Sequence, residues 1–179
     1  MTQEYTITVF SEHITGILSR VVSVFTRRHI NVESLTTSQS SIEGIHRFTI
    51  VVVVTEEMVK KLVAQLDKQI DIIKAFYYTP EETVYQEIAL YKVPSSLFSD
   101  GTEVERLVRS HNARILVIEP AYVVIEKTGH QAETEALLRE LKAIGSIYGF
   151  VRSGRVAIVK PMERLNRYLE SLQISSTEI

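Results

Sequence analysis

The sequence contains no cysteine, and this absence removes several kinds of chemistry at once. Without thiols the chain cannot form disulfides, bind a metal through thiolates or use a thiol nucleophile, and such a chain suits a reducing compartment. Proline and glycine are also scarce, with 4 and 7 residues among 179, while 45% of the residues are hydrophobic and 23% are charged. This composition indicates a folded globular protein rather than a disordered or fibrous one.

Long apolar runs and a strong charge of one sign are absent as well. The longest apolar run, Ile50 to Val54, is far shorter than the ~20 residues of a membrane-spanning helix. The first residues, MTQEYTITVF, lack the basic and apolar regions of a signal peptide. The formal net charge of −2 provides no general basic field for nucleic acid or an anionic membrane. We therefore expect a soluble, cytoplasmic protein.

Hydrophobic periodicity predicts the order βαββαβ in the first part of the chain. Strands are expected at residues 5–9, 31–39, 46–54 and 70–78, and helices at 17–28 and 56–66. Thr55 is the expected N-cap of the second helix, and Glu43-Gly44 the turn before the third strand. This pattern predicts one small domain over residues 1–79.

The same order recurs after a linker predicted at residues 80–83, which contains Pro80. Over residues 84–179 we expect strands at 84–93, 114–119, 122–127, 147–151 and 155–160, helices at 104–112 and 133–145, and a terminal helix that begins at Pro161. A split βαβ pattern in each half predicts a four-stranded antiparallel sheet with two helices on one face. The predicted fold class is therefore α+β, with two ferredoxin-like βαββαβ domains in tandem.

The strand at residues 46–54 is apolar on both faces. One face carries Phe48, Ile50, Val52 and Val54, and the other carries Val51 and Val53. Because helices cover only one face of a single-layer sheet, we expect the second face or an edge to contact another chain. The alternative is that threonine-rich neighbouring strands shield the second face.

Motifs for catalysis or metal binding are not found. The five histidines never fall at i,i+3 or i,i+4, and no P-loop, GxSxG, HExxH or GxGxxG sequence occurs. The pair Glu56-Glu57 lies at a helix start, where carboxylates complement the helix dipole. An RNA-binding sheet would need alternating aromatic residues on its middle strands, and the strand at 46–54 offers only Phe48. Catalysis by this chain alone is therefore not expected.

The loop before the first helix, SEHITG, is the best candidate for a binding site. Gly16 allows a tight turn that leaves the first N–H groups of the helix uncovered, and these groups can bind a carboxylate. Asn31 adds a side-chain amide, and Ile14, Ile17 and Val32 would supply an apolar wall. Such a site suits a zwitterion with a short aliphatic side chain. The alternative is that Gly16 and Asn31 are only turn formers.

The residues themselves resemble the sequences of a known family. The segment TVFSEHITGILSRVVSVFTRRHINVESLTTSQS resembles the opening of the small regulatory subunits of acetolactate synthase (acetohydroxyacid synthase), whose N-terminal half is an ACT domain. The most specific elements are G-x-L-S-R-V, from Gly16 to Val21, and R-R-x-I-N-V-E-S-L, from Arg27 to Leu35. IHRFTIVVVV, EIALYKV, ARILVIEPAYVVIEKTG and RSGRVAIVK also resemble the family, so the resemblance covers nearly the whole chain.

This resemblance implies a non-catalytic subunit in branched-chain amino-acid biosynthesis. Its partner would be the large catalytic subunit, which condenses pyruvate with pyruvate or 2-oxobutyrate. Thiamine diphosphate, magnesium and FAD are expected on that subunit, and no cofactor is expected on this chain. The small subunit stimulates the catalytic subunit and often conveys feedback inhibition by valine. A stand-alone amino-acid sensor with a different partner is the alternative function, and a ferredoxin-like enzyme is a third.

The resemblance also assigns an effector site. ACT domains of the family pair side by side as a homodimer and bind the amino acid at their interface. Carried onto this sequence, the site comprises His13, Ile14, Thr15, Gly16 and Ile17 of one chain and Asn31 of the other, and Val32 belongs to the expected site as part of its apolar wall. His13 departs from the family pattern, because valine-sensitive members commonly have asparagine there. His13 is therefore either a ligand contact whose charge changes near neutral pH or an exposed loop residue without a role, and the identity of the effector stays open.

Overall fold

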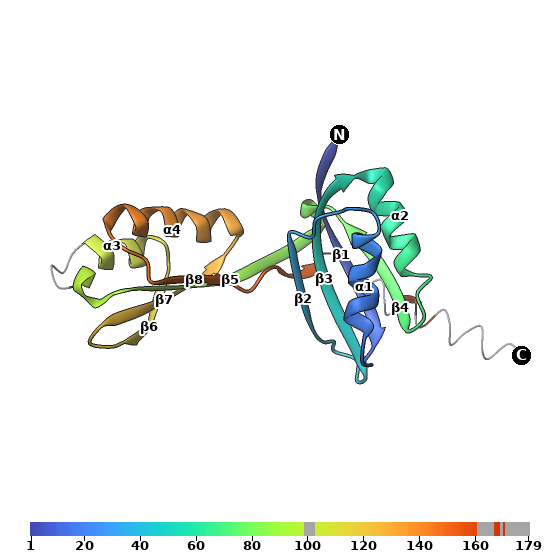
Figure 1. Cartoon of the computed structure of the whole chain (residues 1–179), viewed down its shortest axis with the longest axis horizontal. Coiled ribbons are helices and arrows are strands. Elements are labelled where there is room, and N and C mark those ends of the chain that lie inside the picture. Colours follow the sequence, from blue (N-terminus) through green and yellow to red (C-terminus); the bar gives the residue numbers. More distant parts are fainter. Residues whose placement is uncertain (99–102, 161–166, 169, 171–179) are drawn as a thin grey trace, which may run out of the picture. The chain divides into compact units, whose positions relative to one another are not determined.

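The computed structural model describes residues 1–98, 103–160, 167, 168 and 170. It divides into two compact units, one formed by Met1–Val84 with the described part of Ala157–Ile179 and the other by Tyr85–Val156. Each unit combines an antiparallel sheet with two α-helices, which confirms the predicted α+β class with two ferredoxin-like domains (Figure 1). Of the helices in the described residues, none has both the length and the apolar composition needed to span a bilayer.

The first unit has the predicted order βαββαβ. Its elements are β1 (Thr2–Glu12), α1 (Ile17–Thr26), β2 (Ser34–Gln39), β3 (Ile45–Thr55), α2 (Glu56–Leu66) and β4 (Ile72–Tyr78). The strands form an antiparallel sheet in the order β2-β3-β1-β4. Strands β1 and β3 pair along their whole length, from Thr2 opposite Thr55 to Glu12 opposite Ile45. This long pairing follows from the β-branched residues of both strands, which favour a pleated, half-buried surface.

Helix α2 begins as the sequence predicts. The Thr55 hydroxyl accepts a hydrogen bond from the backbone N–H of Met58, which confirms the predicted N-cap. Glu56 and Glu57 follow in the first turn, and each forms an i,i+4 ion pair with a lysine. Hydrogen bonds from these lysines lower the pKa of both carboxyl groups. Both carboxylates therefore lie in solvent at the start of the helix, as expected.

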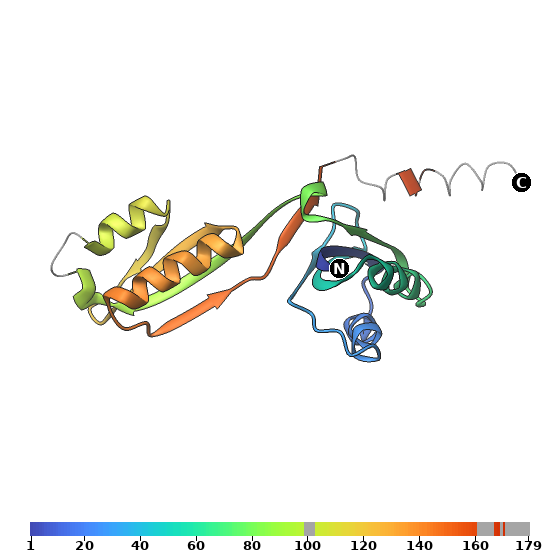
Figure 2. The ribbon, with the colours of Figure 1, turned by 90° about the horizontal axis from the view of Figure 1, so that it is seen from above.

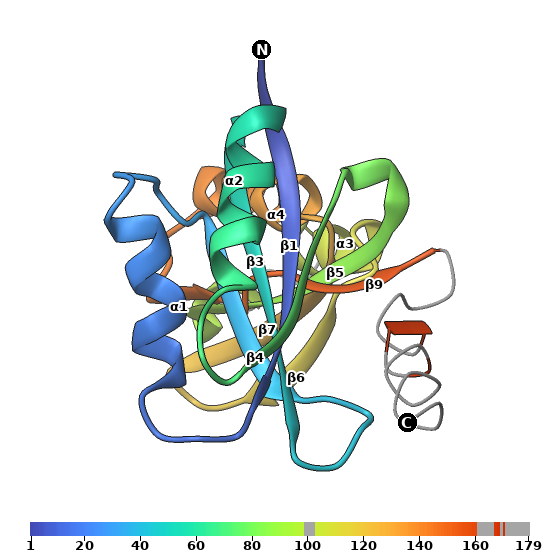
Figure 3. The same ribbon diagram turned by 90° about the vertical axis from the view of Figure 1, so that its right-hand side faces the viewer.

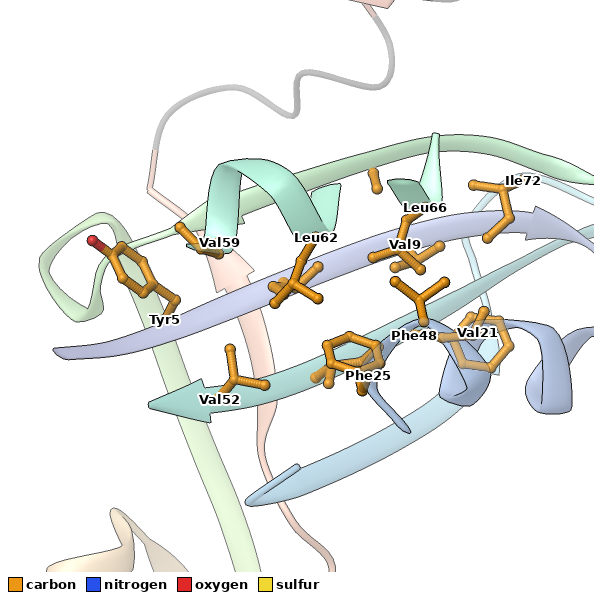
Figure 4. Close-up of a cluster of buried hydrophobic side chains, with 14 of the residues drawn as sticks. Tyr5, Val9, Val21, Phe25, Phe48, Val52, Val59, Leu62, Leu66 and Ile72 are labelled. Atoms are coloured by element: carbon orange, nitrogen blue, oxygen red, sulfur yellow. The ribbon is translucent and has the colours of Figure 1, made fainter. Parts of the chain in front are cut away.

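Both helices of the first unit lie on the same face of the sheet (Figure 3). Figure 4 shows side chains from α1 and α2 directed toward the buried face of strands β1 and β3. The labelled members of this core are Tyr5, Val9, Val21, Phe25, Phe48, Val52, Val59, Leu62, Leu66 and Ile72. Burial of these side chains provides the main driving force for folding of the unit.

The second face of β3 is largely buried within the single chain. Val51 is buried although it points away from the helices, and its partner in β1 is Thr6. Thr8 and Thr49, which are paired with each other, are buried beside it. Val53, near the end of the strand, is half exposed at 50%. Val51 is therefore buried within the single chain, so the expectation that the second face needs another chain is wrong at that residue, and contact of an edge with another chain stays a prediction.

The second unit repeats the plan with one additional strand. Its elements are β5 (Thr83–Pro94), α3 (Glu103–Ser110), β6 (Arg114–Ile118), β7 (Tyr122–Gly129), α4 (Gln131–Ile144) and β8 (Gly149–Arg152), with the short 3-10 helix Ser95–Phe98 after β5. Strand β9 (Val156–Val159) starts at the last residue of this unit, and its other residues group with the first unit. The order β6-β7-β5-β8 is the expected one, but β9 also pairs with β5, so the sheet has five strands rather than four. Helices α3 and α4 lie on one side of it (Figure 1, Figure 2).

The boundary between the units differs from the predicted one. The expected linker at residues 80–83 contains the 3-10 helix Pro80–Glu82, and β5 begins directly after it at Thr83. Residues 157–160 group with the first unit because Arg47 Nη2 donates to the Ala157 carbonyl at 2.8 Å and the Lys160 N–H donates to the Glu82 carbonyl at 2.9 Å. The predicted second domain, 84–179, is therefore longer than the second unit. The expected terminal helix from Pro161 lies almost entirely outside the described residues.

The two faces of β3 provide a matched test of this packing. Ile50→Ala removes a fully buried side chain from the core, so we expect it to lower the free energy of unfolding by about 2–5 kcal/mol. Val53→Ala changes a half-exposed side chain on the same strand, and we expect a loss of no more than about 1 kcal/mol. Denaturant unfolding of both variants measures the difference. Equal losses would contradict the assignment of the core to the Ile50 face.

Candidate functional site

The loop between β1 and α1 lies where three chain segments meet at one end of the first sheet. The Glu12 N–H donates to the carbonyl of Asp71, in the α2–β4 connection, at 3.1 Å. The His13 N–H donates to the carbonyl of Gly44, in the β2–β3 connection, at 3.2 Å. Backbone hydrogen bonds to both neighbouring connections therefore fix the path of the chain into the loop.

Gly16 gives this loop its tight turn into α1. Its φ is 87°, in the left-handed region that residues with a Cβ rarely adopt. Gly16 is the N-cap of α1, and no side chain forms a hydrogen bond that caps this helix end. In the first turn of α1, the Ile17 N–H donates to the Ile14 carbonyl at 3.5 Å and the Arg20 N–H to the Gly16 carbonyl at 3.2 Å. The N–H groups of Leu18 and Ser19, together with the positive end of the helix dipole, are therefore the ones available to water or to an anion.

Two histidines stack beside the same loop. The rings of His13 and His46 are nearly parallel, with centroids 3.9 Å apart and an interplanar angle of 8°. His13 is exposed and His46 is half-buried. The sequence analysis missed this pair, because the two residues are far apart in the chain. The register of β1 on β3, which places His46 opposite Ser11, is the signal that could have revealed it.

An ion pair supports the loop from its other side. The Arg20 guanidinium, on α1, pairs with the carboxylate of Asp71, which the sequence analysis left without a role. Asp71 has a φ of 70°, and its carbonyl also accepts the hydrogen bond from the Glu12 N–H. One residue of the α2–β4 connection thus links the end of β1 to the first turns of α1.

The structure brings some of the predicted effector residues together and separates others. His13, Ile14, Thr15, Gly16 and Ile17 form one continuous loop and helix start, in which His13, Thr15 and Gly16 are exposed. Ile17 is buried in the core and Ile14 packs against it, so these two side chains mainly anchor the loop.

Asn31 and Val32 lie beyond the other end of α1 in the same chain. The ten residues of α1 span about 15 Å along the helix axis, so a single chain does not bring Asn31 to Gly16. Asn31 is exposed, whereas Val32 packs against the core. The arrangement assigned by resemblance therefore requires the Asn31 of a second chain.

The second unit contains a buried polar cluster that resembles a catalytic site only at first sight. The Thr134 hydroxyl donates to the Glu87 carboxylate, and the Tyr91 hydroxyl donates to the Thr134 carbonyl at 2.7 Å. Arg152 lies 3.5 Å from the same carboxylate, and burial raises the pKa of Tyr91. Because these groups satisfy one another inside the fold, the cluster has a structural role. Over the described ranges, no group of three or more potential metal ligands is found either.

Strand β6 forms an exposed apolar edge of the second sheet. It pairs only with β7 among the described residues, and all five of its residues are exposed. Four of these five are apolar: Ile115, Leu116, Val117 and Ile118. The sequence analysis predicted this strand but not its exposure. An apolar edge strand with unpaired backbone groups is typical of a surface that binds another polypeptide.

Comparison with known proteins finds a family match for each half of the chain. A family model described as "AHAS small subunit-like ACT domain" matches residues 7–74, and one described as "Small subunit of acetolactate synthase" matches residues 86–161. The chain is 36% identical over 146 residues to the acetolactate synthase small subunit of Bacillus subtilis, with 81% of this chain and 84% of that protein covered. It is 32% identical over 152 residues to a probable acetolactate synthase small subunit of Methanothermobacter thermautotrophicus, covering 85% and 90% of the two.

The fold agrees with a solved structure of the same kind. The crystal structure of the acetolactate synthase small subunit from Thermotoga maritima matches with a TM-score of 0.80 and 26% sequence identity, covering 88% of this chain and 98% of that one. Two family models, close relatives and a shared fold agree with the geometry of an ACT domain followed by a second ferredoxin-like domain. The chain therefore belongs to the family of acetolactate synthase small subunits, which are regulatory subunits of that enzyme.

Proposed function

We propose that this chain activates the large catalytic subunit of acetolactate synthase and transmits feedback inhibition by a small amino acid, with valine as the expected effector. The observation that carries the proposal is the uncapped N-terminus of α1 at Gly16, on a loop fixed by backbone hydrogen bonds. The bond-making chemistry belongs to the catalytic subunit, which would bind thiamine diphosphate, magnesium and FAD.

The carboxylate and the ammonium group of the effector would each have a partner. Its carboxylate would bind the first N–H groups of α1, where the helix dipole favours negative charge. The side-chain amide of Asn31 from a second chain would bind the ammonium group or the other carboxylate oxygen. The stacked rings of His13 and His46 lie beside this position and would limit the space for the aliphatic side chain.

The surface of the first unit supports a side-by-side homodimer. Strand β2 is a sheet edge, since it pairs only with β3 in the described part of the chain. Leu18 and Val22 on α1 are 45% and 37% exposed, although both are apolar. Pairing of two chains through this region would cover the edge and these side chains, and a two-fold axis would create two equivalent effector sites.

Regulation in this scheme is a coupling of two binding equilibria. The effector stabilises one arrangement of the paired chains, and that arrangement has a different affinity for the catalytic subunit. Couplings of this kind usually amount to about 1–3 kcal/mol, or a change of roughly 5- to 150-fold in affinity. We assign part of the contact with the catalytic subunit to the β6 edge, because four apolar side chains are exposed along this edge strand.

The activator role is tested by mixing the purified chain with its cognate catalytic subunit. We expect acetolactate formation to rise with added small subunit until it saturates, and we expect valine to reverse part of this stimulation. The catalytic subunit alone, with and without valine, is the control. If saturating small subunit produces no stimulation although it binds an amino acid, a stand-alone sensor with another partner is the better assignment.

Asn31 can be tested with a pair of variants. Asn31 is exposed, so Asn31→Ala should preserve the fold while weakening valine binding about fivefold or more, as expected for a lost hydrogen bond. Asn31→Asp keeps an acceptor for an ammonium group but repels a carboxylate, so its affinity identifies the end of the ligand that Asn31 contacts. Calorimetry with valine measures both affinities, and stimulation should stay intact. Unchanged affinity in both variants would remove Asn31 from the site.

The β6 edge can be tested against the opposite edge of its sheet. Ile118, on β6, is 72% exposed, and Val151, on β8, is 60% exposed. Ile118→Asp should raise the concentration of small subunit needed for half-maximal stimulation by about tenfold or more, because a charge at an apolar contact is unfavourable. Val151→Asp should change this concentration little. Similar effects of the two variants, with unchanged melting temperatures, would argue against a specific contact at β6.

A further inference from the structure

A second candidate binding site lies between the two helices of the first unit. The pocket has a volume of about 380 Å³ and is lined by Val24, Arg27, Arg28, Gln65, Lys68 and Gln69. Three of these residues come from the end of α1, and the other three from the end of α2 and the residues after it. Its α1 side lies toward the end of that helix, whereas Lys68 and Gln69 precede Asp71, the residue that pairs with Arg20. Its volume falls within the usual range for small-molecule sites.

The charge of this pocket is uncompensated. Arg27, Arg28 and Lys68 contribute three positive charges, and none of them forms an ion pair with a carboxylate of the described residues. The acidic residues that flank Lys68 in the chain have other partners. Asp67 pairs with Lys74 at 2.5 Å, and its second oxygen accepts the Ala75 N–H at 2.7 Å. Asp71 pairs with Arg20.

Helix dipoles explain only part of this cluster. Arg27 serves the end of its own helix, since its Nε donates to the Ser23 carbonyl at 3.3 Å and its Nη2 to the Ser23 hydroxyl at 3.0 Å. Arg28 instead donates from Nε to the Gln65 side-chain oxygen at 2.8 Å, a bond that joins α1 to α2. This bond holds the guanidinium at the pocket while leaving further N–H donors for a ligand. The arrangement therefore suits the binding of an anion. The interaction of the arginines with the helix dipole alone would not require it.

We propose that this pocket binds a small anion that carries phosphate, such as a diphosphate or a phosphate ester. Guanidinium and ammonium groups recognise phosphate oxygens through charge-assisted hydrogen bonds, and the side-chain amides of Gln65 and Gln69 add neutral donors. A concave site of this size, with Val24 buried among its lining residues, favours a small molecule over the acidic surface of a protein. None of the residues that line this pocket belongs to the proposed amino-acid site at the start of α1.

The experiment is a calorimetric titration of the full chain with inorganic pyrophosphate, with inorganic phosphate in a second series. We expect saturable binding of one pyrophosphate per chain, with weaker binding of phosphate because it offers fewer oxygens. The double variant Arg28→Gln and Lys68→Gln should lower the affinity for pyrophosphate about tenfold or more, since charged hydrogen bonds are lost.

A matched control separates a built site from general electrostatic attraction. The double variant Lys60→Gln and Lys61→Gln removes two positive charges, as the pocket variant does. These exposed lysines pair with Glu56 and Glu57 and do not line the pocket. This control variant should change the affinity for pyrophosphate less than about twofold. Equal losses in the two double variants, or binding that never saturates, would overturn the proposal. If pyrophosphate does not bind and the pocket variant instead loses stimulation of the catalytic subunit, the pocket contacts an acidic protein surface and the proposal is wrong.

Discussion

The pairing of β1 with β3 is the constraint on which the candidate site depends. The two strands run in register from Thr2 opposite Thr55 to Glu12 opposite Ile45, and a core beneath α1 and α2 buries one face of both. Where the pairing ends, backbone hydrogen bonds of Glu12 and His13 fix the path of the chain into α1. His13 then lies against His46, and Gly16 turns the backbone so that α1 begins without a side-chain cap. A shift of register would remove each of these features together.

Helix α1 is the regulatory element of the first unit in the proposed function. Its buried face includes Val21 and Phe25 and fixes the helix on the sheet, whereas Leu18 and Val22 on its outer face are exposed. Its first turn offers amide groups to a carboxylate, and its last turn leads to the arginine pair beside α2. A helix with binding groups at both ends and an apolar outer side can respond to two ligands and to a second chain. The proposed regulation through binding follows from this arrangement.

Periodicity and capping rules predicted the local elements well, because those elements depend on neighbouring residues. The Thr55 cap and the βαββαβ order of the first unit are such cases. Features that depend on register between distant segments were missed, including the stack of His13 on His46 and the pairing of β9 with β5. The burial of Val51 was misjudged for the same reason, since it depends on the fold around the strand and not on the strand's own residues. The family resemblance rested on specific residues from Gly16 to Leu35, and hydrophobic periodicity alone does not identify a family from them.

The central claim is that an amino acid binds the first N–H groups of α1. Hydrogen–deuterium exchange of the full chain, measured with and without valine, observes those groups directly. The account predicts slower exchange in the first turn of α1, at Leu18 and Ser19, and at Asn31, with little change in the second unit. Unchanged exchange in that turn at a valine concentration that saturates binding, or protection confined to other elements, would contradict it.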